Sequence, residues 1–397
     1  MTAPMVSRRA FAAAGLALPF LARVAEAAIP PNRKFVVVIC RGGMDGLSVA
    51  APVGDPDYRA LRAGLALGDE ALRLDGTFAL NPALPTVHKL ALSGQARLAP
   101  AVATPDRARS HFEAQDVLET GAAGVYATSS GWLNRAVQSL AAVGKVEAIS
   151  VGPTAPLILR GPAPAGSWSP GRGIDTTARL PTLLQDLYKD DPLLGPALAR
   201  GLATEALARE SGAAGDTSMT GQMRPAAGQG RDAAQALGQS LAGFLNAPGG
   251  PQIAAVSLDG FDTHANQAPL LATRLASLDA LIDGLHTGLG PAWKDTVVLV
   301  VTEFGRTARV NGTGGTDHGT GSTAVVLGGA LKPGGIVGDW PTLKRAALFE
   351  DRDVYPAFDM RALEKGLLAD HLGLDRRALD AAVFPGSADV RPLLGVT

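Results

Sequence analysis

Short apolar runs separate longer amphipathic stretches along most of the chain. Residues 35–40 form a continuous run of apolar, mainly β-branched side chains, which is the pattern of a strand buried on both faces. Residues 295–303 carry the strongest pattern of this kind. Weaker runs predict further strands at 95–104, at 146–152, in the first part of 251–267 and at 323–331.

The amphipathic stretches between these runs predict helices. We expect helices at 105–121, 130–143, 231–246, 270–289 and 361–373. Gly121 is expected to end the first of them, and Ser130 to cap the second. Strands that alternate with helices indicate an α/β fold with a mainly parallel sheet flanked by helices. Residues 160–250 begin as a loop-like stretch and continue with helical patterns, so we expect one α/β domain over 33–397 with a mostly helical insertion.

The first 27 residues have the pattern of an export signal. Arg8 and Arg9 precede an apolar run at 11–22, and the small-residue ending Ala-Glu-Ala follows at 25–27. This order is typical of a twin-arginine signal, and the apolar run is shorter than a bilayer-spanning helix requires. We expect cleavage near Ala27, export by the twin-arginine translocase to the periplasm or the extracellular space, and no stable membrane span once the signal is removed.

Composition and charge add three constraints. The chain has 397 residues, of which 46% are hydrophobic and 18% charged, so it can bury a sizeable core. Its net charge of -1 gives no reason to expect nucleic acid or an anionic membrane surface as a partner. Cys40 is the single cysteine, which excludes an internal disulfide and agrees with folding before export.

Polar residues suited to chemistry follow four of the predicted strands. In open parallel sheets, ligands bind beyond the carboxyl ends of the strands, so side chains in these loops can converge. Three of the six histidines fall in such loops. The candidates in chain order are Asp45, Ser110, His111, Asp259, Asp262, His264, Glu303, Asp317 and His318.

This set of residue types points to metal chemistry on an anionic substrate. Carboxylate oxygens together with imidazole nitrogens suit zinc, manganese or iron. One or two such ions beside a hydroxyl nucleophile would suit phosphoryl or sulfuryl transfer. Ser110 lies near a helix start, which favours bound anions. Arg41, Arg306 and Arg309 lie in the same loops and could hold an anionic group with two hydrogen bonds.

Plainer interpretations of these residues stay open. Asp45 could serve only a glycine-rich turn, Asp262 or Asn266 could be a helix cap, and Ser110 and His111 could be helix-surface residues. Glu303 could form a structural ion pair with Arg306. Asp317 and His318 lie in the glycine-rich stretch 314–322, where a turn does not require a histidine. We therefore predict that His318 is a ligand, whereas Asp317 binds the metal, orients His318 or shapes the turn.

Other catalytic patterns are absent from the sequence. No G-x-S-x-G elbow occurs, because the stretch Gly-Thr-Gly-Ser-Thr-Ala at 319–324 lacks the final glycine. No phosphate-binding P-loop occurs. The glycines after the first strand, at 42–46, do not fit G-x-G-x-x-G, which argues against a dinucleotide cofactor.

A resemblance to a known family rests on six short motifs in order. Together they resemble the motifs of a large twin-arginine-exported bacterial family known as a domain of unknown function, over nearly the whole chain after the signal. That family is similar in fold to the alkaline phosphatase and sulfatase superfamily of α/β hydrolases, which use one or two divalent metals. The motifs lie at 41–47, 109–116, 131–136, 259–267, 302–307 and 315–322.

The resemblance implies roles for individual residues. Asp45 matches a metal-binding aspartate after the first strand, and Ser110 stands near the nucleophile's place, with His111 as a rival. One metal site is implied at Asp262, or Asp259, with His264 and His318. A second site, from Asp45, Glu303 and either Ser110 or His111, departs from the superfamily pattern because no histidine follows Glu303.

Two functions follow from these expectations. The first is an exported hydrolase of a phosphate or sulfate ester that uses one or two divalent ions, with zinc or manganese favoured. In it Ser110 or His111 would act on the substrate, while Arg41 and Arg306 would hold the anion. The second is a non-catalytic scaffold of the same fold that binds a metal, an anion or an anionic glycan. Asp45, Asp262, His264, Glu303, Asp317 and His318 are the predicted metal ligands.

Overall fold

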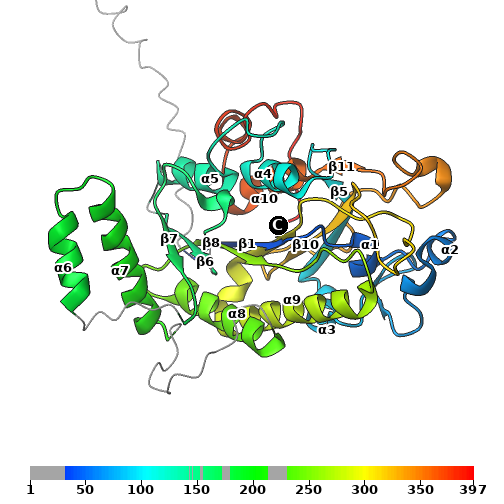
Figure 1. The fold of residues 1–397 in the computed structure, drawn as a ribbon, viewed down its shortest axis with the longest axis horizontal. Coiled ribbons are helices and arrows are strands. Elements are labelled where there is room, and N and C mark those ends of the chain that lie inside the picture. Colours follow the sequence, from blue (N-terminus) through cyan, green and yellow to red (C-terminus); the bar gives the residue numbers. More distant parts are fainter. Residues whose placement is uncertain (1–31, 143, 145, 153–154, 172–178, 213–229) are drawn as a thin grey trace, which may run out of the picture.

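The computed structural model describes residues 32–142, 144, 146–152, 155–171, 179–212 and 230–397 (Figure 1). The predicted export signal, 1–27, lies outside the described residues, and so does part of the predicted insertion, 213–229. No helix in the described part of the chain is both long and apolar enough to cross a membrane.

An eight-stranded sheet forms the centre of the fold, in the order β11-β5-β10-β9-β1-β8-β6-β7. Strand β10 is antiparallel to both of its neighbours, and the other pairs are parallel. The predicted α/β class with a mainly parallel sheet is therefore confirmed. The strands are β1 (Lys34–Cys40), β5 (Ala96–Ala103), β6 (Ala148–Val151), β7 (Ala165–Trp168), β8 (Ile253–Leu258), β9 (Thr296–Val301), β10 (Ser322–Leu327) and β11 (Phe358–Asp359).

Helices cover both faces of this sheet, as Figure 1 shows. Alternate residues of β1 point to opposite layers: Val36 and Val38 belong to one apolar cluster, and Phe35 and Val37 to the other. This two-sided burial explains why the strand is apolar throughout. The first layer holds α3 (Pro85–Leu92), α8 (Arg231–Asn246) and α9 (Gln267–Leu289), and the second holds α4 (His111–Thr120), α5 (Trp132–Ala141) and α10 (Met360–Leu372).

The remaining elements are short or peripheral. A small antiparallel sheet has the order β2-β4-β3. Its strands and the other helices are β2 (Ala50–Ala51), β3 (Leu72–Arg73), β4 (Ala79–Leu80), α1 (Gly46–Val49), α2 (Tyr58–Arg62), α6 (Arg179–Tyr188), α7 (Leu194–Glu210) and α11 (Arg376–Ala378).

Some predicted boundaries differ from the structure. The helix expected from residue 105 begins at His111, because Arg109 has a left-handed backbone (φ 57°) that no continuous helix allows. It ends at Gly121 as expected. The cap of α5 is Gly131 rather than Ser130. The stretch interpreted as a loop contains β7, a short edge strand that pairs with β6 and has no long apolar run of its own.

The candidate residues lie at one edge of the sheet. Strands β1, β8 and β9 are parallel neighbours, so the loops that follow them leave from the same side. Strand β5 also ends there, because Val102 near its end pairs with Ser322 at the start of antiparallel β10. The long connection from β9 to β10 therefore stays at the edge where the parallel strands end.

Candidate metal centre

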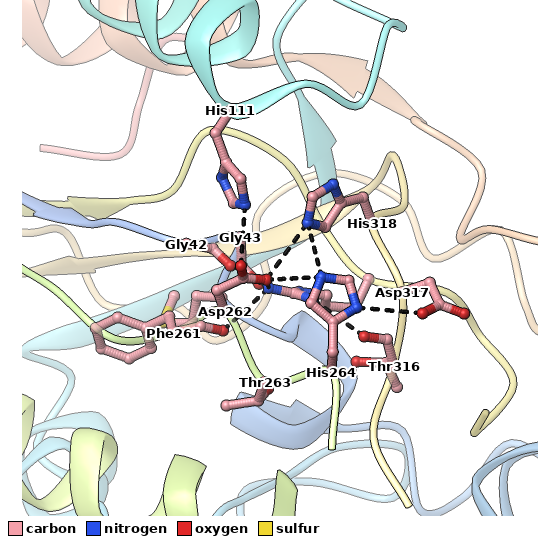
Figure 2. Close-up of polar contacts among 12 residues, drawn as sticks. Gly42, Gly43, His111, Phe261, Asp262, Thr263, His264, Thr316, Asp317 and His318 are labelled. Atoms are coloured by element: carbon pink, nitrogen blue, oxygen red, sulfur yellow. Dashed lines mark hydrogen bonds and ion pairs between the residues drawn. The ribbon is translucent and has the colours of Figure 1, made fainter. Parts of the chain in front are cut away.

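Three imidazole rings gather around Asp262 at this edge (Figure 2). His111 is the first residue of α4, which follows β5. Asp262 and His264 lie in the loop between β8 and α9, and His318 lies in the connection between β9 and β10. Three chain segments that are remote in sequence thus supply the cluster, and each segment follows a buried strand.

His111 is oriented by a buried carboxylate. Its Nδ1 lies 2.9 Å from Oε1 of Glu303, to which it donates. Its Nε2 is buried and has no hydrogen-bond partner among the described residues. That nitrogen lies 3.4 Å from Oδ2 of Asp262. An imidazole that donates from Nδ1 to a carboxylate and presents a bare Nε2 is the usual arrangement of a metal-binding histidine.

His318 is held in the same way by a backbone carbonyl. Its Nδ1 donates to the carbonyl oxygen of Arg109 at 2.8 Å. Its Nε2 therefore carries the lone pair, and it lies 3.3 Å from Oδ1 of Asp262. Burial lowers the pKa of His318, so the ring favours the neutral form that binds metals.

His264 completes the group with a second carboxylate partner. Its Nδ1 lies 3.2 Å from Oδ1 of Asp317. Its Nε2 lies 3.0 Å from Oδ1 of Asp262 and 3.0 Å from Nε2 of His318. Two ring nitrogens that both present lone pairs at this distance repel each other unless a cation or a proton lies between them.

The donor set fits a divalent transition metal. The ligand atoms of His111, Asp262 and His318 all lie within 4.8 Å of one another. Ligands at about 2.0–2.1 Å from a tetrahedral zinc ion are about 3.3 Å apart, close to the separations around Asp262. Imidazole with one carboxylate suits zinc or manganese. The bare, buried Nε2 of His111 is the observation that makes the fit specific.

Glu303 lies behind His111 and is saturated with donors. Its Oε1 accepts from the backbone of Gly42 at 2.8 Å and from Gln115 at 3.1 Å, in addition to His111. Burial disfavours the charged carboxylate, but the hydrogen bonds from His111, the Glu303 backbone, Gln115 and Gly42 lower its pKa to about 2. Glu303 is a predicted ligand, and that role stays a prediction; in the structure its hydrogen bond to His111 raises the pKa of His111.

The guanidinium of Arg306 donates its hydrogen bonds to protein groups and is not open to solvent. Its side chain is fully buried. Its guanidinium donates to carbonyl oxygens of Gly43 at 2.7 Å and Thr316 at 3.0 Å, and to Oδ1 of Asp262 at 2.5 Å. Burial opposes the charge of Asp262, but the hydrogen bond from Arg306 lowers its pKa overall. The ion pair anticipated for Arg306 thus forms with Asp262, and not with Glu303.

Asp45 follows β1 as expected but makes other contacts. Its Oδ2 accepts from Ser48 at 2.7 Å, from the guanidinium of Arg62 and from Gln267 at 2.5 Å. One carboxylate oxygen of Asp45 thus accepts from a guanidinium, an amide and a hydroxyl, and a role of Asp45 as a metal ligand stays a prediction. The structure brings Asp262, His264, Asp317 and His318 together and leaves Asp45 in a separate buried network.

The remaining candidates lie near the cluster without joining it. Ser110 is the cap residue of α4, and its side chain makes no capping hydrogen bond. Arg41 lies next to Gly42, and its side chain is 19% exposed; it pairs with Glu119 at 2.8 Å and donates to Gln115 at 3.1 Å. Asp259 is exposed.

Sequence reasoning missed the partners that orient the ligands. Gln115 lies one helical turn after His111 on α4, a spacing that places both on the same helix face and could have suggested the contact with Glu303. No sequence signal indicates that the carbonyl of Arg109 holds His318, because any residue offers that oxygen. Gln267 was seen only as the end of a motif, although it is fully buried.

Comparison with solved structures gives distant similarities. The chain is 12% identical to the C-terminal periplasmic domain of EcEptC from Escherichia coli in complex with zinc, over 92% of this chain and 88% of that chain, with a TM-score of 0.40. A protein in the alkaline phosphatase superfamily from Vibrio parahaemolyticus is 11% identical over 77% and 62%, with a TM-score of 0.35. The lipoteichoic acid synthase LtaP from Listeria monocytogenes is 10% identical over 78% and 68%, with a TM-score of 0.35.

No curated protein matches the chain. The family described as "Protein of unknown function (DUF1501)" matches residues 91–383. That range includes all four residues of the cluster, His111, Asp262, His264 and His318, and it covers most of the chain. The membership expected from the sequence motifs is confirmed: this chain belongs to the DUF1501 family of proteins of unknown function.

Proposed function

We propose that this chain is an exported metal-dependent hydrolase that acts on a phosphate or sulfate ester. The proposal rests on one observation. Three histidines each have Nδ1 against an acceptor, namely Glu303, Asp317 or the carbonyl of Arg109, so all three Nε2 atoms are left to converge on Asp262. Neutral rings would face one carboxylate with three acceptor nitrogens, an arrangement that is repulsive unless a cation or a proton lies among them.

The chain's own residues divide the work. Asp262, His111 and His318 would hold one divalent ion, with His264 beside them as a further ligand. When bound, zinc or manganese supplies a Lewis acid that polarises an oxygen of the ester. Glu303 and Asp317 keep the rings of His111 and His264 in the metal-binding tautomer.

Ser110 is the proposed nucleophile. It caps α4, so the partial positive charge of the helix N-terminus favours an anionic group beside it. Its Oγ would attack phosphorus or sulfur, the alcohol would leave with the proton of Ser110, and water would then cleave the phosphoserine or sulfoserine ester. Arg41 is the proposed anion contact, because its side chain is partly exposed whereas that of Arg306 is fully buried.

A scaffold function is the second candidate, and the engagement of the arginines favours it. Arg306 is fully buried, and Arg41 is already paired with Glu119 at 2.8 Å. If both guanidinium groups keep these contacts, neither would hold the anion of an ester for reaction. The centre would then hold a metal and bind an anionic ligand or glycan without turnover.

Turnover of aryl phosphates and aryl sulfates separates the two functions. We expect the zinc- or manganese-loaded chain to hydrolyse at least one of them, and Ser110→Ala to lose that activity while keeping its metal. Ser93, the exposed residue that caps the C-terminus of α3, provides the control as Ser93→Ala. Loaded protein that leaves every ester intact would remove the hydrolase proposal and retain the scaffold.

A further inference from the structure

Gln267 is a buried amide with both ends in use. It is the first residue of α9, and its side chain is inaccessible to solvent. Its Nε2 donates to Oδ2 of Asp45 at 2.5 Å. Its Oε1 accepts from the hydroxyl of Thr316 at 2.6 Å and from the hydroxyl of Thr263 at 3.1 Å. One side chain therefore joins three segments of the chain.

Two of these segments carry the metal ligands. Thr263 lies between Asp262 and His264, and Thr316 lies two residues before His318. Because one oxygen of Gln267 accepts from both hydroxyls, it sets the spacing of the two ligand loops. Backbone hydrogen bonds also join the two loops: the amide of Thr316 donates to the carbonyl of Thr263 at 3.3 Å, and the amide of Gln267 itself donates to the carbonyl of Gly314 at 3.0 Å.

The third segment carries Asp45, which is the buried base of this hydrogen-bond network. Asp45 is buried, and its Oδ1 has no hydrogen-bond partner among the described residues, so it depends on the donors at Oδ2. Those donors are Gln267, Ser48 and the guanidinium of Arg62. Arg62 is also buried, and it donates to the carbonyl of Thr307 at 3.2 Å. The base is thus a buried ion pair that also holds the connection between β9 and β10.

Two of the proposed ligands are substantially exposed. The side chains of Asp262 and His264 are 43% and 45% exposed. Exposed side chains on loops gain their positions from the backbone beneath them, and a misplacement of about 1 Å is enough to weaken a site. The buried contacts of Gln267 hold this backbone from below, together with the guanidinium of Arg306, which donates to the carbonyls of Phe261 and Thr316.

We propose that Gln267 is the positioning residue of the metal centre: its amide holds the loops of Asp262 and His318 at ligand spacing before the metal binds. This inference rests on the proposed metal site and assigns to Gln267 and Asp45 a role other than ligation. Gln267 acts through Thr263 and Thr316 and does not touch the ion.

Zinc affinity, measured by competition with a chelator, tests the role of Gln267. Gln267→Ala should lower zinc affinity about 10–100-fold, as loss of outer-shell partners of a metal does elsewhere. Asn134 provides the matched control, because it is a buried amide that binds Leu159, Ala163 and no residue of the cluster. Asn134→Ala should lower the melting temperature and leave zinc affinity unchanged.

Two conservative substitutions at Thr316 separate the effect of its hydrogen bond from that of its packing. They also test the positioning role of Gln267 if Gln267→Ala does not fold. Thr316→Val keeps the shape and removes the hydroxyl donor to Gln267, so zinc affinity should fall. Thr316→Ser keeps the donor, so the affinity should stay within a factor of about 3 of the unsubstituted chain. Equal affinities for Val and Ser would overturn the positioning role.

The result for the unsubstituted chain separates this inference from the proposed function. An unsubstituted chain that binds no zinc overturns the metal site and this inference together. An unsubstituted chain that binds zinc, with Gln267→Ala and Thr316→Val binding it equally well, overturns the inference alone. Activity is not needed for any of these measurements.

Discussion

Replacing Glu303 with glutamine keeps the shape of the side chain and removes its charge. In the structure Oε1 accepts from Gly42, Gln115 and His111, and Oε2 lies 3.0 Å from the hydroxyl of Thr302. In Glu303→Gln the carbonyl oxygen can keep the three hydrogen bonds, while the new amide donates to the Thr302 hydroxyl. The substitution thus isolates the contribution of the carboxylate charge to His111 as a ligand.

The expected loss of zinc affinity depends on which hydrogen bonds the substitution keeps. Removal of an outer-shell partner of a ligand lowers metal affinity about 10–100-fold. Because Glu303→Gln retains the geometry, we expect the lower end, about tenfold or about 1.4 kcal/mol of binding free energy. Glu303→Ala also releases the ring of His111 and leaves Gly42 and Gln115 without an acceptor, so it should reach about 100-fold, about 2.8 kcal/mol.

Chelator competition with zinc at about pH 8, above the ordinary pKa of histidine, measures these differences without competition from protons. Glu364→Gln is the matched control, because it makes the same substitution at a buried glutamate of α10 outside the cluster; burial and Asp359 raise the pKa of Glu364 well above its usual value. Equal zinc affinity of the unsubstituted chain, Glu303→Gln and Glu303→Ala would refute the assignment of His111 as a ligand held by Glu303.

Two further predictions concern the backbone beneath Asp262 and the pH dependence of folding. Gly42→Ala would place a Cβ in a clash with the backbone nitrogen of Asp262 at a φ of 115°, so we expect a loss of about 1–3 kcal/mol in unfolding free energy and weaker zinc binding. Gly76→Ala is the control, because an added Cβ there meets nothing within 4 Å, and equal behaviour of the two variants would contradict the prediction. Burial lowers the pKa of His371 from 6.5 to about 4, so the unfolded chain binds more protons between these values and stability should rise with pH across this window, by about 3 kcal/mol in total. Urea unfolding of the zinc-free chain at both ends of the window should show this rise in stability, and the same measurement on His371→Gln should not. An unchanged dependence of stability on pH in the variant would exclude His371 as the source of the rise.

The sequence allowed the sheet and the edge of the site to be predicted because both have local signatures. A strand buried on both faces must be apolar throughout, and residues 35–40 and 295–303 are. Asp262 and His318 follow or precede such strands, so the parallel topology brings them to one edge. Strand β7 could not be found in this way, because a short strand at the edge of the sheet is defined by its pairing with β6.

The contacts within the site depended on partners that no local pattern reveals. Asp45 follows a strand, as residues of the cluster do, yet its carboxylate forms an ion pair with Arg62 of α2. The sequence placed Glu303 among the metal ligands and His111 either beside it in a second metal site or at the substrate. In the structure Glu303 is fully buried, and His111 lies between it and Asp262. Their functional roles stay predictions.

The most direct test of the metal centre is anomalous scattering from crystals of the natively exported protein, recorded at the zinc and manganese absorption edges. The account predicts a peak within about 2.0–2.2 Å of Nε2 of His111, Nε2 of His318 and a carboxylate oxygen of Asp262, and no peak beside Asp45. A crystal grown with zinc present that shows no peak between His111, Asp262 and His318 would contradict it.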